Sequence, residues 1–260
     1  FRINIIDFID ERFMFVHMHH IVTDGWCLPV LIGDLQKYYE ILLMGIRAEE
    51  LTDEIYREVL SNTSYAQYVN WIRNQNENEI SEYWRSLLTN CSLAHIFGKE
   101  TKEVTKNEDM VTFEMPLSHE LTLYIEQFAS KNKVSYNTVF ESAFGIVLQK
   151  YSGSDEVVFD KIISGRSIPL KNIEITVGPF INTVPVRIKC DESSDLSAVL
   201  REIQNQTVNA NKYGVLPLSE IYRNCDIDSK SIDSLFVFEN YFTGDISDIE
   251  KGPLSLKAVS

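Results

Sequence analysis

Three of the five histidines of the chain lie within four consecutive positions, at His17, His19 and His20. An imidazole titrates near neutral pH and can accept or donate a proton, so this cluster is the densest chemical signal in the sequence. Because side chains alternate along a strand, His17 and His19 would share one face and His20 would take the other. Only one of the adjacent pair can then face a given cleft directly, and its neighbour packs or forms hydrogen bonds.

Asp24 and Gly25 follow the histidines and mark a turn. The Asp24 carboxylate could accept a hydrogen bond from a histidine ring, or it could pair with a distant arginine and hold the loop. Gly25 permits a positive φ or a close approach of the backbone to a ligand. The spacing alone leaves these alternatives open for both residues.

Three interpretations of the histidine cluster compete. The first is a set of core histidines at the end of a strand. The second is a metal site, but a catalytic zinc ion needs a third protein ligand, and neither His95 nor His119 lies in a metal-binding motif. The third is acid–base catalysis by one imidazole, in a loop after a strand where sites are common. We expect no metal. The sequence contains no Gly-x-Ser-x-Gly elbow, P-loop or dinucleotide-binding turn, which leaves base-assisted transfer to an incoming nucleophile.

The elements around the histidines are predicted from hydrophobic spacing. Residues 12–22 are apolar on both faces, which predicts a buried strand, and 23–25 break it. Helical spacing from Leu28 to Met44, closed by Gly45, predicts a helix. The remaining expected elements are helices at about 64–88, 119–131, 136–151 (capped by Ser135 and ended by Gly153) and 196–212, and strands at 111–117, 156–164, 183–190 and 234–241. This interleaving of strands and helices indicates an α/β or α+β fold.

Composition limits the class of protein. The chain has 260 residues, 44% of them hydrophobic, which supports a folded core, and its formal net charge is −14. Nucleic-acid binders and proteins that dock on anionic membranes rely on clustered Lys and Arg, so both classes are disfavoured. No apolar run approaches the roughly 18–20 residues that span a bilayer, and no signal peptide is visible.

Four cysteines stand far apart and form no Cys-x-x-Cys pair: Cys27, Cys91, Cys190 and Cys225. This pattern predicts reduced thiols in a cytoplasmic protein, with buried small hydrophobes as the simplest role for each. Residues 98–109 are polar and aperiodic, which predicts either a linker or a long surface loop.

Several segments together resemble one family, the condensation domains of nonribosomal peptide synthetases. Residues 19–26 resemble its His-His-x-x-x-Asp-Gly motif. Residues 65–71 resemble its Tyr-x-Asp-[Phe/Tyr]-Ala-x-Trp helix, with Gln67 in place of the usual Asp. The other matching segments are 163–166 (Ser-Gly-Arg), 177–187 (Gly-x-Phe-x-Asn-Thr-x-Pro-x-Arg), 216–221 and 233–240. These matches keep their order and spacing over residues 17–240.

The resemblance implies a chloramphenicol-acetyltransferase-like fold, in which two similar α/β lobes form a V around a tunnel. In that fold this chain would be incomplete at both ends. Residues 1–97 would be the C-terminal part of the first lobe, 98–109 the inter-lobe linker, and 110–260 most of the second lobe.

The resemblance also implies the reaction. An acceptor amine attacks a donor thioester, and both substrates arrive on the phosphopantetheine arms of peptidyl carrier domains. No cofactor would be bound by the chain itself, and an adenylation domain would be a neighbour in the same synthetase. Two alternatives remain: a stand-alone acyltransferase of the same fold that uses a free amine or alcohol, and an inactive module that binds or recruits a partner.

Residue roles follow from the same resemblance. His20 would be catalytic, either as a general base on the amine or as a group that positions it. His19, Asp24, Gly25 and Arg166 would support the motif, and an Asp24–Arg166 salt bridge would hold the loop and join the lobes.

Three further positions complete the comparison with the family. Asn182 would lie near the tunnel, although a capping or loop role is an equal alternative. Cys27 stands where the family often has Ser, and residues 211–213 (Asn-Lys-Tyr) replace a commoner His-Gln-Tyr run. Neither departure touches the expected catalytic histidine.

Overall fold

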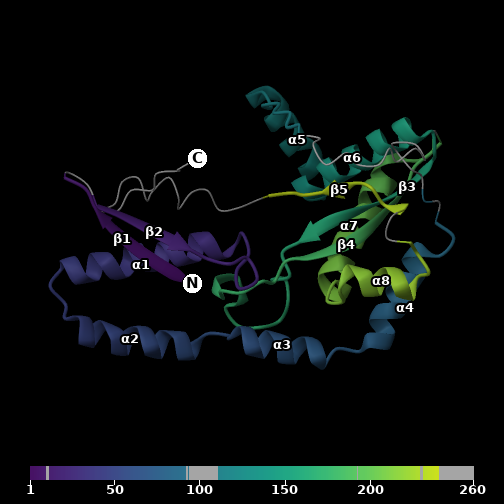
Figure 1. Cartoon of the computed structure of the whole chain (residues 1–260). Coiled ribbons are helices and arrows are strands. Elements are labelled where there is room, and N and C mark those ends of the chain that lie inside the picture. The colour runs from purple at the N-terminus through teal and green to yellow at the C-terminus, as the bar shows by residue number, and fades with distance from the viewer. Residues whose placement is uncertain (10–11, 92, 94–110, 192, 229–230, 240–260) are drawn as a thin grey trace. The chain divides into compact units, whose positions relative to one another are not determined.

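The computed structural model describes residues 1–9, 12–91, 93, 111–191, 193–228 and 231–239 (Figure 1). These residues form two compact units that interleave along the sequence. Unit 1 holds residues 1–75 and 164–181 with Glu239, and unit 2 holds 76–163 and 182–238, as far as each range is described.

The predicted linker at 98–109 lies outside the described residues, so the division into 1–97 and 110–260 stays a prediction. The observed contacts group residues 76–91 with the chain after that segment. They group 164–181 with the chain before it. Contacts between residues far apart in sequence, and not chain order, therefore define the two units.

Unit 1 begins with two antiparallel strands, β1 (Arg2–Asp7) and β2 (Arg12–His17), in which Arg2 lies opposite His17. The predicted strand over 12–22 is wrong in length and in burial, because β2 ends at His17 and most of its side chains are exposed. Among the described strands β2 pairs with β1 alone, and a two-stranded ribbon has little interior in which to bury side chains. His19 and His20 lie beyond the strand, so strand alternation does not set their directions.

The helices of unit 1 follow. Helix α1 (Cys27–Leu43) confirms the prediction, and the chain leaves it through Gly45, at a φ of +89°. Helix α2 (Ala48–Ser61) was not predicted. A 3₁₀ turn, η1 (Ile173–Ile175), belongs to the later segment of this unit.

The prediction of a single helix over 64–88 is wrong, because this segment forms two helices. They are α3 (Tyr65–Arg73) in unit 1 and α4 (Glu77–Leu88) in unit 2. Asn76 is the N-cap of α4, and its side-chain oxygen accepts a hydrogen bond from the Glu79 N–H at 3.4 Å. Asparagine is a favoured N-cap residue, which explains why a second helix begins here.

Unit 2 contains α4, α5 (His119–Asn132), α6 (Tyr136–Ser152), α7 (Leu196–Tyr213) and α8 (Leu218–Asn224). The predictions for α5, α6 and α7 are confirmed, including the Ser135 cap of α6 and its end at Gly153 with a φ of +67°. Helix α8 was not predicted.

The sheet of unit 2 has the order β4-β3-β5, formed by β3 (Glu156–Ile163), β4 (Asn182–Lys189) and β5 (Leu235–Phe236). Strand β3 pairs antiparallel with β4 and parallel with β5. Of the strand expected at 234–241, the structure forms two residues among those described, Leu235 and Phe236. The one expected at 111–117 is wrong, because that segment is exposed and no described strand pairs with it.

Strand β3 is buried on both faces, as the alternation of its side chains shows. Val157 and Phe159 pack with residues of α6 and α7, whereas Val158 packs with residues of α4 and α8. Helices therefore cover both faces of this sheet, as in an α/β fold. No helix in the described part of the chain is long and apolar enough to cross a membrane.

Candidate active site

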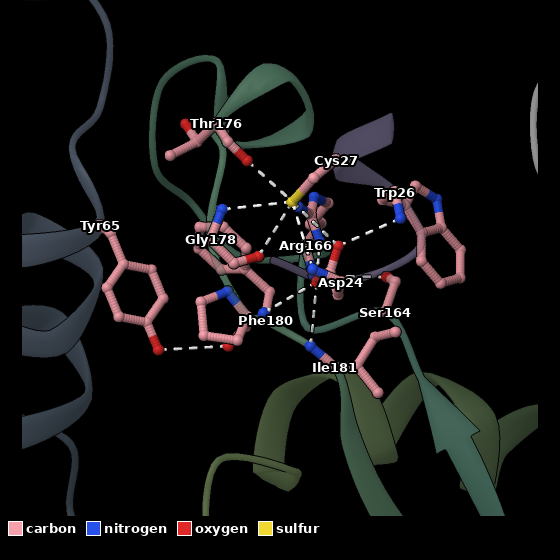
Figure 2. Close-up of polar contacts among 11 residues, drawn as sticks. Asp24, Trp26, Cys27, Tyr65, Ser164, Arg166, Thr176, Gly178, Phe180 and Ile181 are labelled. Carbon is pink, nitrogen blue, oxygen red and sulfur yellow. Dashed lines mark hydrogen bonds and ion pairs between the residues drawn. The ribbon is translucent and has the colours of Figure 1, made fainter. Parts of the chain in front are cut away.

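The turn after the histidines is anchored by Asp24, whose polar contacts are shown in Figure 2. Its side chain is almost completely buried. Arg166 donates from Nη1 to Asp24 Oδ2 at 2.7 Å, and the two side chains are only 5% and 2% exposed. The same Oδ2 accepts the backbone N–H of Phe180 at 2.9 Å and that of Ile181 at 3.3 Å. Oδ1 accepts the backbone N–H of Trp26 at 3.1 Å. The predicted salt bridge is therefore confirmed.

The environment of Asp24 keeps its side chain ionised. Burial is the largest single influence and would raise the pKa of this carboxyl. The hydrogen bonds from Arg166, the Phe180 backbone and Cys27, with the positive charge of Arg166, together outweigh burial, so the pKa lies below its ordinary value. A buried carboxylate of this kind depends on its cation, because removing one partner leaves an uncompensated charge in the interior.

Arg166 is held on several sides besides its ion pair. Its Nη2 donates to the Thr176 carbonyl at 3.1 Å, and the guanidinium carbon lies 4.3 Å from the centroid of the Phe180 ring. Asp24 and Arg166 lie on opposite sides of residues 98–109 in sequence, yet both belong to unit 1. The ion pair thus joins distant segments of one unit, and a role in joining two lobes stays a prediction.

Gly165 lets the Ser-Gly-Arg segment reach this position. Its φ is +68°, and a Cβ built there would lie 2.0 Å from the Phe180 carbonyl oxygen. Ser164 Oγ accepts the Arg166 N–H at 3.3 Å. Any side chain at position 165 would force residues 164–166 away from Phe180, and with them the guanidinium of Arg166.

Replacing Gly165 with alanine is expected to destabilise the protein by at least about 2 kcal/mol more than Gly153→Ala, because side-chain overlap adds to strain at positive φ. Gly153 is a matched control, since its φ is +67° and nothing lies within 4 Å of its Cβ position. Denaturant unfolding of both variants measures the difference. Equal losses would contradict a steric requirement at Gly165.

Aromatic side chains of α3 support the segment that contacts Asp24. Tyr65 Oη donates to the Pro179 carbonyl at 3.2 Å, and the rings of Tyr68 and Phe180 lie 4.6 Å apart. Gly178 permits this packing, because a Cβ there would lie 2.4 Å from Tyr65 Cδ2. Burial raises the pKa of Tyr68 to about 12, so its phenol stays protonated at neutral pH.

Helix α3 begins with a capping box, and Gln67 completes it. The Gln67 side chain accepts the Ser64 N–H at 2.7 Å, and Ser64 Oγ accepts the Gln67 N–H at 3.3 Å. The side chain of an acidic residue three positions after the cap could accept the same backbone N–H. The replacement of the usual Asp by Gln therefore leaves this helix start intact.

The two adjacent histidines have different surroundings, although both are exposed. His19 Nδ1 accepts the Ile21 N–H at 3.0 Å, and the His19 carbonyl accepts the Val22 N–H at 3.1 Å. When neutral, His19 therefore carries its proton on Nε2. His20 has no hydrogen-bond partner among the described residues. One imidazole thus stabilises the turn, whereas the other makes no hydrogen bond with the described residues.

The other predicted positions fall elsewhere. Gly25 is not among the glycines with positive φ, which leaves close backbone approach as its possible contribution. His17 ends β2, His119 begins α5, and His95 lies outside the described residues. Within the described ranges no three His, Cys, Asp or Glu side chains are placed to share a metal ion.

Asn182 belongs to unit 2 and uses its amide group inside that unit. Its Nδ2 donates to the carbonyls of Gly214 at 2.9 Å and Leu216 at 2.7 Å, and its Oδ1 accepts the Thr183 N–H at 2.9 Å. These bonds match the loop role that was the alternative for this residue, and a place beside a tunnel stays a prediction.

The family model described as "Condensation domain" matches residues 1–258, nearly the whole chain. The chain belongs to the condensation-domain family. This condensation domain is 31% identical to bacitracin synthase 3 of Bacillus licheniformis over 260 residues, which are all of the chain and 4% of that protein. It is 33% identical to tyrocidine synthase 3 of Brevibacillus parabrevis over 228 residues, which are 86% of the chain and 3% of that protein.

Two solved structures share the fold. The first condensation domain of the CDA synthetase superposes with a TM-score of 0.61 at 17% identity, over 86% of this chain and 48% of that one. The SgcC5 protein from Streptomyces globisporus superposes with a TM-score of 0.56 at 18% identity, over 84% and 49%. The chain thus spans about half the length of these structures, and the predicted fold class is confirmed.

The structure of this condensation domain adds one residue that the sequence did not single out for the site. Cys27 is completely buried, and its Sγ lies 3.3 Å from Asp24 Oδ1. The available signal was its place three residues after Asp24, at the start of the helix that follows the turn. A departure from the family pattern is thus part of the buried cluster that holds the turn.

Proposed function

We propose that this condensation domain forms amide bonds in a nonribosomal peptide synthetase, with His20 as the catalytic imidazole. The observation that carries the proposal is the contrast between the two histidines on one turn. His19 is engaged by the backbone, whereas His20 is exposed and has no hydrogen bond among the described residues. The buried ion pair of Asp24 holds the end of that turn.

The reaction requires one bond to form and one to break. The acceptor nitrogen attacks the donor thioester carbon, the carbon–nitrogen bond forms, and the carbon–sulfur bond breaks. The amine loses a proton and the leaving thiolate gains one. A histidine close to both atoms can accept the first proton and return it to sulfur. Because a thioester is already activated, placing the two substrates correctly supplies much of the rate.

The partners proposed for the site are two peptidyl carrier domains, one that presents the donor and one that presents the acceptor. Their phosphopantetheine arms would supply the thiols, and the condensation domain would need no cofactor of its own. We also propose an adenylation domain as a neighbour in the same synthetase and the cytoplasm as the location. This proposal is supported by the similarity of the chain to peptide synthetases. The chain spans only a small part of their length.

The decisive experiment compares a carrier-bound acceptor with the same amine free in solution. The full native polypeptide receives a loaded donor carrier, and mass spectrometry measures the amide product. Tethering raises the effective concentration of the acceptor, so we expect the bound amine to react at least about 100-fold faster than the free amine at equal concentration. Absence of product with any acceptor would contradict the proposal and favour a binding or recruitment module.

A second candidate is a stand-alone acyltransferase that uses a free amine or alcohol. One observation favours keeping it: the structure of SgcC5 is a complex with a free aromatic ethanediol, and that protein shares the fold. If the free acceptor in the same assay reacts as fast as the carrier-bound one, this second function is the correct one.

A further inference from the structure

Cys27 occupies the centre of the contacts that hold the turn after His20. No part of its surface is exposed, and it is the first residue of α1. Its sulfur touches the turn and two distant segments, which contribute Arg166 and Gly178 (Figure 2). The three segments belong to unit 1, so the arrangement lies within one compact unit.

The contacts of the sulfur are polar and come from both donors and acceptors. The backbone N–H groups of Gly178 and Asp24 point to Sγ at 3.3 and 3.4 Å, and Arg166 Nη2 lies 3.6 Å away. The thiol itself can donate to Asp24 Oδ1 or to the Gly178 carbonyl, each at 3.3 Å. One S–H proton can serve one acceptor at a time, while the sulfur lone pairs receive the N–H groups.

These bonds replace backbone pairing that the two N–H groups lack. In the described parts of the chain, the amide protons of both Asp24 and Gly178 are donated to this sulfur. A buried N–H that loses its partner must be satisfied in some other way, and the backbone moves to achieve this. Removing the sulfur should therefore displace the turn at Asp24.

A displacement at Asp24 reaches His20 through a short piece of chain. Only residues 21–23 separate the two, and the turn at His19 and Val22 holds the other end. We propose that Cys27 is a positioning residue for His20, and that its thiol holds the turn against Gly178 in the geometry that the reaction needs. This inference rests on the proposed function and adds a residue to the machinery of that site.

The test compares alanine and serine at position 27 in the full native polypeptide, with loaded carriers as substrates. Cys27→Ala should lower kcat about ten- to 100-fold, because small misplacements at a reacting centre have effects of this size. The KM for the donor carrier should change little, since docking does not involve a buried thiol. Cys27→Ser retains a hydroxyl that donates and accepts, so it should recover most of the lost kcat.

Cys190→Ala is the matched control, because it removes a partly exposed thiol from unit 2. It should leave kcat unchanged. The inference is overturned if Cys27→Ala keeps the kcat of the unmodified protein, or if Cys27→Ser is as slow as Cys27→Ala, which would make the contribution one of packing alone.

Amide hydrogen exchange gives a readout that does not depend on turnover. Exchange at Asp24 and Gly178 should be faster in Cys27→Ala than in the unmodified protein, and Cys27→Ser should slow it again. If the unmodified protein forms no amide, the proposed function fails by itself, whereas unchanged exchange in Cys27→Ala overturns the role of the thiol. The two failures are therefore distinguishable.

Discussion

Replacing His20 with valine is expected to lower the rate of amide formation at least about 100-fold, without a measurable change in folding. General acid–base catalysis by one side chain contributes about 10²–10⁴ in rate, and loss of positioning would add to this. The imidazole is exposed and has no hydrogen bond within the described chain, so its removal leaves no buried group unpaired. Product formation by loaded carriers and the unfolding temperature are the two measurements.

His17→Val is the matched control, because His17 is also exposed and ends the neighbouring strand. It should keep full turnover. His19→Val removes the acceptor of the Ile21 N–H and should perturb the turn without removing the proton carrier. Unchanged product yield in His20→Val would eliminate the catalytic role of His20.

Replacing Arg166 with alanine is expected to lower the free energy of unfolding by about 3–5 kcal/mol, with a matching loss of soluble protein. The variant leaves the Asp24 carboxylate buried, with backbone N–H groups but no cation. The guanidinium also covers the Phe180 ring, so packing is lost as well. Denaturant unfolding of the purified protein measures the effect.

Arg201→Ala is the control for loss of an arginine from an ion pair. Arg201 and Asp195 lie 3.7 Å apart with 62% and 68% of their side chains exposed, and such pairs contribute about 0–1 kcal/mol. A double variant, Asp24→Asn with Arg166→Ala, should be more stable than Arg166→Ala, because no buried charge remains. A normally folded Arg166→Ala protein that loses only turnover would show that Arg166 acts in the reaction and not in the fold.

Local signals predicted the helices of unit 2 well. The start of α6 is determined by Ser135, which accepts the Thr138 N–H, and its end by Gly153 at positive φ. Both interactions involve residues within one helical turn of each other, so a short window of sequence contains them. The same reasoning failed at 64–88, where apolar spacing continues although α3 ends at Arg73 and the Asn76 side chain begins α4.

Burial was harder to predict than secondary structure. Residues 12–17 and 156–163 both look like buried strands, yet only the second, β3, has neighbours on two edges and helices over both faces. An apolar strand exposes or buries its side chains according to what packs on it. That information lies in other parts of the chain.

The sequence by itself determined the family, because the motifs can be recognised from their residue types, order and spacing. The resemblance to that family also predicted the Asp24–Arg166 pair. Only the tertiary structure decided which histidine has no hydrogen bond within the described residues and that the Cys27 thiol lies at the centre of the buried cluster. The physical reason is distance along the chain: Cys27 and Gly178 are 151 positions apart, and no local pattern predicts that the Cys27 sulfur contacts the Gly178 backbone. A hydrogen bond depends on the placement of both partners, and that placement results from packing of the whole unit.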